Sequence, residues 1–318
     1  MTARCYRFNE TIDGTIVKAI AAGLALTLAA ALSTSAVAAT PRPSKPVEIA
    51  GHTFRSSDGA RLHVLESRPA SGGASTIILV PGWSMPARLF RPQLRALGRR
   101  HHVIAFDPRG QGRSDIPDSG YDIDRRADDL RDLISQYRGG HERVVLVGWS
   151  LGALEALQYV HRHGDERLSA LVLVDSSVGE GSPGSPSAFP DELRRNRRKA
   201  TTDFVKAIFK TPLPDKEVRA LVDGAMRMPL DDSLALFPSA VPREHWRELA
   251  RGFAKPLLYA VTPQFAGQAR ELAAARPGTR TRVFEKAGHA LFVDEAEGFN
   301  RLLEDFIAKS PPGTAGGV

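Results

Sequence analysis

Gly148-Trp149-Ser150-Leu151-Gly152 follows the apolar run Val144–Val147 and leads into a helical stretch over Leu151–His163. A serine at such a strand-to-helix turn is held in a strained backbone conformation that exposes its hydroxyl. The two glycines leave room for the tight turn and for close packing of strand on helix. Serine alone is a poor nucleophile, so the pattern predicts a histidine base and an orienting acid elsewhere in the chain. Without this context, the same five residues fit an ordinary glycine-rich turn.

Outward from this turn, apolar strands alternate with helical stretches. Helices are expected over 88–100, 122–137, 151–163 and 294–308. Eight strands are expected, over residues 47–54, 61–66, 76–80, 102–106, 144–147, 168–174, 256–261 and 281–284. Ser57-Asp58-Gly59 indicates a hairpin, so the first two strands are expected to be antiparallel. The alternation predicts an α/β fold, with an eight-stranded, mostly parallel sheet covered by helices on both faces.

The alternation fails between residues 179 and 254, where a Gly- and Pro-rich segment precedes charged, helical sequence without a strand signal. We interpret 179–254 as a helical cap over the sheet edge that carries Ser150. Residues 47–178 and 255–310 then form the core. Residues 40–46 are a proline-rich linker, and 311–318 are expected to be a disordered tail.

Two candidate partners for Ser150 follow other strands. His289 lies in Ala287-Gly-His-Ala290, between the last strand and the last helix, and Asp175 closes the strand 168–174. The carboxyl ends of parallel strands meet at one edge of a sheet, so we expect all three side chains to meet there. The imidazole would act as base, and the carboxylate would fix its tautomer. Capping of the local turn is the alternative role for Asp175.

Backbone N–H groups complete the predicted site. Pro81-Gly82-Trp83 follows the strand 76–80, and the glycine lets the backbone approach a substrate closely. The N–H groups of Trp83 and Leu151 are therefore candidates for an oxyanion hole. The alternative is a simple loop glycine beside a core tryptophan.

These residues resemble the α/β-hydrolase family, in particular its capped, esterase- and haloperoxidase-like members. The resemblance rests on Gly148–Gly152, on Phe106-Asp-Pro-Arg-Gly-Gln-Gly-Arg-Ser-Asp115 and on Ala287–Ala290. It implies the chain order serine, acid, histidine and a two-step mechanism through an acyl-enzyme. It also implies that Asp107 and Arg109 shape their loop rather than take part in catalysis.

Two departures from the family pattern affect the site. Members usually carry His-Gly where this chain has Pro81-Gly82, so a supporting hydrogen bond of the oxyanion loop is missing from this position. The acid usually follows the seventh strand, but Thr262-Pro263-Gln264-Phe265 holds no carboxylate. Some members place the acid after the sixth strand, where Asp175 stands. Glu271 is a poorer candidate because it lies inside the following helix.

The expected activity is hydrolysis of a carboxylic ester or a similar acyl compound. Trp83 and Trp149 near the nucleophile favour an apolar acyl or aryl substrate, although both also fit core packing. The alternatives are a cofactor-free perhydrolase or haloperoxidase, a C–C or lactone hydrolase, and a low-turnover ligand-binding protein with this fold. No metal-ligand cluster and no phosphate-binding loop occurs in the sequence, so neither cofactor nor metal is expected.

Residues 1–39 have the pattern of a secretory signal peptide. Lys18 precedes the apolar stretch Ala19–Leu32, and Ser33–Ala39 supplies small residues for cleavage. The chain is therefore expected to be exported to the periplasm or the medium. After processing, no stable membrane span is expected. The alternative is that the segment stays uncleaved and anchors the chain in the membrane. Glu10 and Asp13 are unusual in the first part of a signal peptide, which suggests that translation starts later, near Val17. The only cysteine, Cys5, lies in this segment, so the processed chain would hold no disulfide.

The charge balance points to no polyanionic partner. The formal net charge is +7, but basic residues are spread along the chain. The exception is Arg194–Lys199, which fits a solvated helix face better than a nucleic-acid or membrane-surface site. We therefore expect a small-molecule acyl substrate and no nucleic acid; the sequence does not indicate an oligomeric state.

Overall fold

A computed structural model describes residues 46–70, 74–137, 144–182 and 187–310 of the chain. The predicted signal peptide (1–39), nearly all of the linker (40–46), the tail (311–318), Val17 and Cys5 lie outside the described residues. What the sequence indicates about those segments therefore stays a prediction.

One sheet of eight strands organises the fold, in the order β1-β2-β4-β3-β5-β6-β7-β8. The strands are β1 (Ala50–Arg55), β2 (Arg61–Ser67), β3 (Thr76–Val80), β4 (His102–Asp107), β5 (Val144–Trp149), β6 (Leu168–Val174), β7 (Leu257–Val261) and β8 (Arg280–Val283). β2 pairs antiparallel with both β1 and β4, and every other neighbouring pair is parallel. The predicted eight-stranded, mostly parallel sheet is thereby confirmed.

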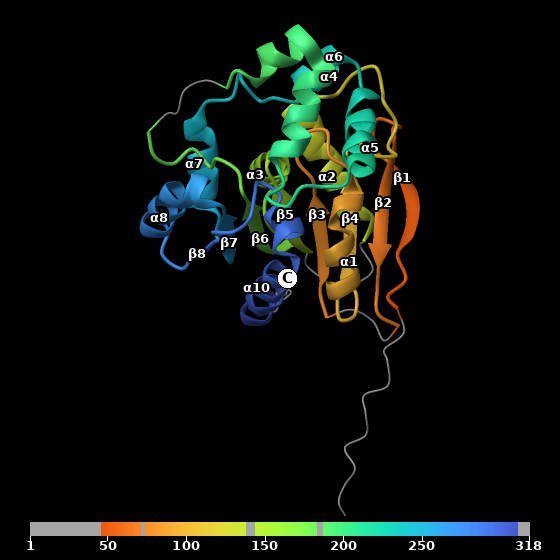
Figure 1. The fold of residues 1–318 in the computed structure, drawn as a ribbon. Coiled ribbons are helices and arrows are strands. Elements are labelled where there is room, and N and C mark those ends of the chain that lie inside the picture. Colours follow the sequence, from red (N-terminus) through yellow and green to blue (C-terminus); the bar gives the residue numbers. More distant parts are fainter. Residues whose placement is uncertain (1–45, 71–73, 138–143, 183–186, 311–318) are drawn as a thin grey trace, which may run out of the picture. The chain divides into compact units, whose positions relative to one another are not determined.

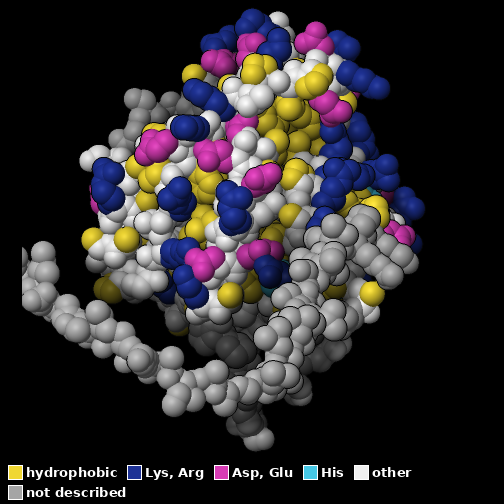
Figure 2. Space-filling model, turned by 60° about the horizontal axis from the view of Figure 1, so that its bottom comes forward, with side chains coloured by type: hydrophobic (Ala, Val, Ile, Leu, Met, Phe, Trp, Pro, Cys, Tyr) yellow, Lys and Arg dark blue, Asp and Glu magenta, His cyan; other side chains and the backbone are white. Residues whose placement is uncertain are grey.

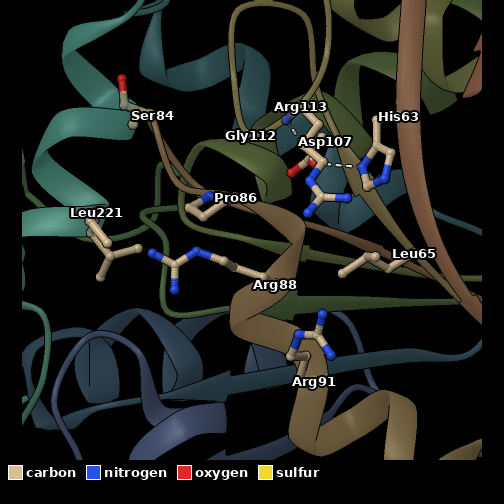
Figure 3. A pocket seen from close by; sticks show the side chains of 12 residues that line it. His63, Leu65, Ser84, Pro86, Arg88, Arg91, Asp107, Gly112, Arg113 and Leu221 are labelled. Carbon is tan, nitrogen blue, oxygen red and sulfur yellow. Dashed lines mark hydrogen bonds and ion pairs between the residues drawn. The ribbon is translucent and has the colours of Figure 1, made fainter. Parts of the chain in front are cut away.

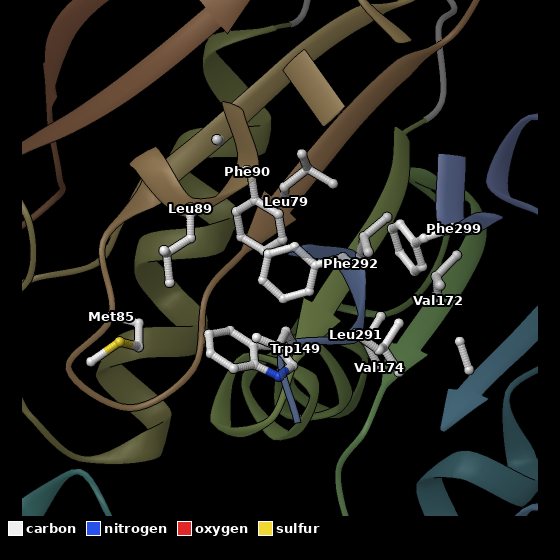
Figure 4. Close-up of a cluster of buried hydrophobic side chains, with 14 of the residues drawn as sticks. Leu79, Met85, Leu89, Phe90, Trp149, Val172, Val174, Leu291, Phe292 and Phe299 are labelled. Atoms are coloured by element: carbon white, nitrogen blue, oxygen red, sulfur yellow. The ribbon is translucent and has the colours of Figure 1, made fainter. Parts of the chain in front are cut away.

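Helices cover both faces of the sheet, as predicted (Figure 1). The helices outside the 179–254 segment are α1 (Arg91–Leu97), α2 (Ile123–Gln136), α3 (Leu151–His163), α8 (Ala266–Ala275), α9 (Leu291–Asp294) and α10 (Ala296–Lys309), with short 3-10 turns at Ala87–Phe90 and Pro263–Phe265. Alternate strand residues face opposite ways. Ile77 and Leu79 of β3 pack in the cluster with α1 and α10, and Ile78 and Val80 pack in the cluster with α2, α3 and α8. Figure 4 shows part of the first cluster, where Trp149 lies among aromatic and aliphatic side chains.

Four helices and no strand occur in the described part of 179–254. They are α4 (Phe189–Ala207), α5 (Asp215–Met226), α6 (Leu230–Ala235) and α7 (Arg243–Gly252). Figure 1 shows α4, α5 and α6 gathered at the top, whereas α7 lies beside α8. Trp246 and Ala250 of α7 are buried in the cluster shared with α3 and α8. No helix within the described residues is both long enough and apolar enough to span a membrane.

Basic side chains are dispersed over the surface with acidic ones between them, as Figure 2 shows for one face. The basic run of α4 follows this pattern. Arg194, Arg198 and Lys199 form ion pairs with Asp191, Asp223 and Asp203, respectively. Arg197 instead donates to the Met228 carbonyl and the Ser233 hydroxyl, at 2.5 and 2.8 Å. Local pairing and helix packing therefore account for four of the six residues in this run.

Candidate functional site

The turn between β5 and α3 holds Ser150 in a conformation that L-residues rarely adopt, with φ +55° and ψ −121°. A Cβ on Gly148 would overlap the carbonyl oxygen of Gly152, and a Cβ on Gly152 would lie 2.5 Å from the Val80 carbonyl oxygen. The backbone can make this turn only with glycine at both positions. The strain is local and is held by β5 and β6, because the Ser150 N–H donates to the Val174 carbonyl at 2.9 Å.

Gly148→Ala is expected to destabilise the chain by at least about 2–3 kcal/mol, because the new methyl group meets backbone atoms that cannot move aside. Gly224→Ala in α5 is the matched control, since a Cβ there meets nothing within 4 Å. An alanine in a helix interior is favoured over glycine, so the control should gain up to about 1 kcal/mol. Urea unfolding of both variants measures the difference. Equal stability of the two would contradict this account of the turn.

Asp175 and His289 meet at the carboxyl edge of the sheet. His289 Nδ1 lies 2.8 Å from Asp175 Oδ2. The Asp175 side chain is fully buried, whereas the His289 side chain is 23% exposed. An ionised carboxylate only accepts hydrogen bonds, so Nδ1 is the donor and Nε2 is left as the acceptor. This is the tautomer that a general base requires.

The end of β7 orients the carboxylate of Asp175, although it carries no acid itself. The Thr262 N–H donates to Asp175 Oδ1 at 2.6 Å. The buried Tyr259 hydroxyl, also from β7, donates to the carbonyl of Ser176, the residue after Asp175, at 2.5 Å. Burial and the nearby Asp175 carboxylate raise the pKa of Tyr259. Glu271, the alternative acid, lies on α8 and accepts the Gly181 N–H at 2.7 Å; in the described part of the chain no hydrogen bond or ion pair joins it to His289.

Trp149 connects the histidine to the serine turn. Its indole N–H donates to the His289 carbonyl at 2.8 Å, and the two rings lie 5.3 Å apart between centroids. Within the described residues, the Ser150 hydroxyl and His289 Nε2 form no hydrogen bond with each other. Such bonds are often long in unliganded enzymes and shorten when substrate binds. The structure therefore brings all three predicted side chains to one edge, with the acid and the histidine in direct contact.

The loop after β3 comes close to the serine. A Cβ on Gly82 would lie only 2.9 Å from the Ser150 Cβ. The next N–H in the chain is that of Trp83, and Leu151 begins α3 on the other side of the serine. Neither N–H has an acceptor among the described residues. Both predicted oxyanion donors are thus unengaged beside Ser150, and Leu151 adds the positive end of a 13-residue helix.

The side chain of Trp83 joins an aromatic cluster with residues of the 179–254 segment. Its ring lies 5.1, 5.3 and 5.6 Å from the rings of Phe189, Phe204 and Phe237, respectively. Its indole N–H donates to the Ser233 carbonyl of α6 at 2.8 Å. Leu151 packs in the same cluster. Both residues of the predicted oxyanion hole therefore have side chains in an apolar layer beneath α4 and α6.

Asp107 and Arg109, at the end of β4 and in the loop after it, have buried side-chain partners. Asp107 Oδ2 lies 2.8 Å from His63 Nδ1, and Arg109 pairs with Asp129 at 2.7 Å. Asp107 also accepts the N–H groups of Ala87 and Arg113, so both residues brace their loop, and neither forms a hydrogen bond with Ser150 or His289 among the described residues. The side chain of Gln111, in the same loop, forms hydrogen bonds with the backbone of the loop that carries Trp83. Gln111 was not among the residues predicted from the sequence; its position between Gly110 and Gly112 was the available signal.

No group of three or more His, Cys, Asp or Glu in the described ranges is arranged to hold a metal.

This fold and site match a known protein family. Residues 77–302 match the model of the alpha/beta hydrolase family. The chain is 28% identical over 262 residues to the non-heme chloroperoxidase CPO-A1 of Kitasatospora aureofaciens, with 75% of this chain and 94% of that protein covered. It is 27% identical to the pimeloyl-[acyl-carrier protein] methyl ester esterase of Vibrio atlanticus, with 75% and 96% covered.

Solved structures agree with this match. A putative aryl esterase from Burkholderia cenocepacia superposes with a TM-score of 0.70 at 26% identity, and the alignment covers 82% of this chain and 99% of that one. The long coverage on both sides means that the similarity extends over the whole catalytic fold rather than over one motif.

Proposed function

We propose that this chain, which belongs to the alpha/beta hydrolase family, cleaves carboxylic esters or similar acyl compounds with Ser150 as its nucleophile. Hydrolases of the esterase and haloperoxidase type are its relatives. The observation that carries the proposal is the 2.8 Å contact between His289 Nδ1 and Asp175 Oδ2 beside the strained serine turn. It leaves Nε2 free to accept the serine proton.

The proposed reaction has two halves. Ser150 Oγ attacks the acyl carbon while His289 Nε2 takes the hydroxyl proton, and Asp175 stabilises the imidazolium. The N–H groups of Trp83 and Leu151 donate to the oxyanion. His289 then returns the proton to the leaving oxygen, which departs as the alcohol and leaves the acyl-enzyme. Water attacks the acyl carbon as His289 accepts its proton, and the acid leaves as Ser150 Oγ regains a proton.

The aromatic cluster around Trp83 supports an apolar acyl or aryl substrate. Phe189, Phe204 and Phe237 are only partly buried, so they leave apolar surface near the candidate oxyanion donors. Desolvating an aryl or alkyl group against such side chains is favourable, at about 25 cal/mol for each Å² of apolar surface buried.

Perhydrolysis is the second candidate, because one relative is a non-heme chloroperoxidase. Hydrogen peroxide would replace water in the second half of the same reaction and release a peroxy acid. Lactone or C–C hydrolysis and ligand binding with little turnover stay as further alternatives. Covalent capture of Ser150 separates the enzymes from a binding protein.

The test uses residues 40–318 with p-nitrophenyl esters of increasing acyl length and with a fluorophosphonate probe. We expect turnover, a preference among acyl lengths, and a single labelled peptide that contains Ser150. Added peroxide with monochlorodimedone and bromide reports peroxy acid formation. If no ester is turned over and the probe leaves Ser150 unlabelled, the proposal is wrong.

We also propose that the chain is exported after removal of residues 1–39. The support is the order of Lys18, the apolar stretch 19–32 and the small residues 33–39. N-terminal sequencing of protein recovered from the periplasm or medium tests this. A start near Thr40 is expected, and an intact N-terminus on a membrane-bound chain would contradict it.

A further inference from the structure

We propose that Gln111 is a positioning residue that holds the loop presenting the Trp83 N–H to the oxyanion. The inference rests on the proposed function and assigns a role to a residue of the 106–115 motif beyond shaping its own loop. Gln111 is 1% exposed, and among the described residues its side chain forms no hydrogen bond with Ser150.

Three hydrogen bonds join the Gln111 side chain to the loop on both sides of Trp83. Its Oε1 accepts the Ser84 N–H at 3.0 Å. Its Nε2 donates to the carbonyls of Gly82 at 3.2 Å and Met85 at 2.9 Å. One amide thus satisfies backbone groups of the residue before Trp83 and of the two residues after it. The backbone is therefore held on both sides of the Trp83 N–H, the candidate oxyanion donor.

The loop needs such a clamp because its conformation is unfavourable and incompletely packed. Ser84 has φ +56°, which costs a residue with a Cβ about 1–3 kcal/mol. Its hydroxyl is buried and has no hydrogen-bond partner among the described residues, so it does not stabilise the turn. Ser84 and Pro86 also line a cavity of about 280 Å³, shown in Figure 3, so packing on that side is incomplete. The residue before Gly82 is Pro81, whose side chain offers no hydrogen bond.

The glycines that flank Gln111 direct it inward. Gly110 and Gly112 have φ of +76° and +53°. A Cβ on Gly112 would overlap the Asp107 carboxylate. The backbone of Gln111 is held by its own turn, since its N–H donates to the Pro108 carbonyl at 2.9 Å and its carbonyl accepts the Ser114 N–H at 3.0 Å. The Gly-Gln-Gly turn therefore has a defined conformation that points the amide at the oxyanion loop.

A buried ion pair connects Gln111 to the helix that carries the second donor. Arg126 Nη2 lies 3.4 Å from Gln111 Oε1, and this fixes which end of the amide is the acceptor. Arg126 Nε donates to Glu155 of α3 at 2.6 Å. Glu155 lies one turn after Leu151 on that helix. One buried hydrogen-bonded network thus joins the loop that carries Trp83 to the helix that begins at Leu151.

The test compares Gln111→Met with wild type in residues 40–318. Methionine keeps nearly the same length but forms none of the three hydrogen bonds. We expect kcat for a p-nitrophenyl ester to fall about tenfold to a hundredfold with KM changed less than about twofold. The inhibition constant of a trifluoromethyl ketone, which mimics the tetrahedral intermediate, should rise by the same factor. Hydrogen exchange of the peptide spanning 82–86 should become faster, because the Ser84 N–H loses its acceptor.

Gln158→Met is the matched control. Gln158 is a buried glutamine of α3 that bonds to Asp124 at 2.6 Å and to His245 at 2.8 Å, away from the oxyanion loop. It should lose comparable stability and keep wild-type kcat, inhibitor affinity and loop exchange. Wild-type kcat and inhibitor affinity in Gln111→Met, or unchanged exchange over 82–86, would overturn the proposal. Absent wild-type turnover would instead refute the proposed function, and the exchange measurement would still decide whether Gln111 holds the loop.

Discussion

Ser150→Ala is expected to lower kcat for ester hydrolysis by about a million-fold, to the level supported by binding and the oxyanion donors alone. Alanine keeps the Cβ, so the backbone at φ +55° is as strained as in wild type and the fold should be unaffected. The only chemical change is the loss of the oxygen that attacks the acyl carbon. Burst-phase kinetics with a p-nitrophenyl ester measure both the turnover and the acyl-enzyme, and the variant should show neither.

Ser135→Ala is the control for this substitution. Ser135 lies on α2, where its hydroxyl donates to the Asp132 carbonyl at 2.8 Å, remote from the site. Its kcat should equal that of wild type. If Ser150→Ala kept a kcat within a hundredfold of wild type, another group or a bound water would have to be the nucleophile.

The sheet and the position of the serine turn follow from local sequence. The apolar runs at 76–80, 144–147 and 168–174 are long enough to be buried strands, and helical or turn-forming sequence separates them. Because parallel strands all end at the same edge, residues in the segments that follow them are brought together there. Asp175 and His289, 114 residues apart, can for this reason be paired from the order of strands and helices along the chain.

Side-chain contacts across that edge do not follow from local sequence. Thr262 acts on Asp175 through a backbone N–H, which carries no residue-type signal. Gln111 reaches the loop after β3 only because β4 lies beside β3 in the sheet, an order that the sequence does not state. The aromatic side chains of α4 that meet Trp83 depend on how those helices pack. These interactions are set by tertiary structure.

Asp175→Asn is expected to lower kcat about ten-thousand-fold with the fold intact. Asparagine tolerates the positive φ of this position, +43°, so the backbone should accept it. The Thr262 N–H, 2.6 Å from Oδ1, can be satisfied only by the amide oxygen. The amide NH₂ group must then face His289 Nδ1, which becomes an acceptor and transfers its hydrogen to Nε2. That tautomer cannot take the proton from Ser150.

Glu271→Gln is the matched control, because it makes the same change at the alternative acid on α8. It removes a charge but keeps an acceptor for the Gly181 N–H, so kcat should stay within about twofold of wild type. Steady-state kinetics of both variants with one p-nitrophenyl ester, alongside their thermal unfolding, provide the measurement. A large loss in Glu271→Gln with near-normal rates in Asp175→Asn would transfer the acid role to α8. Because Asp175 is buried at the end of β6 and contacts both Thr262 and His289, we expect the opposite result.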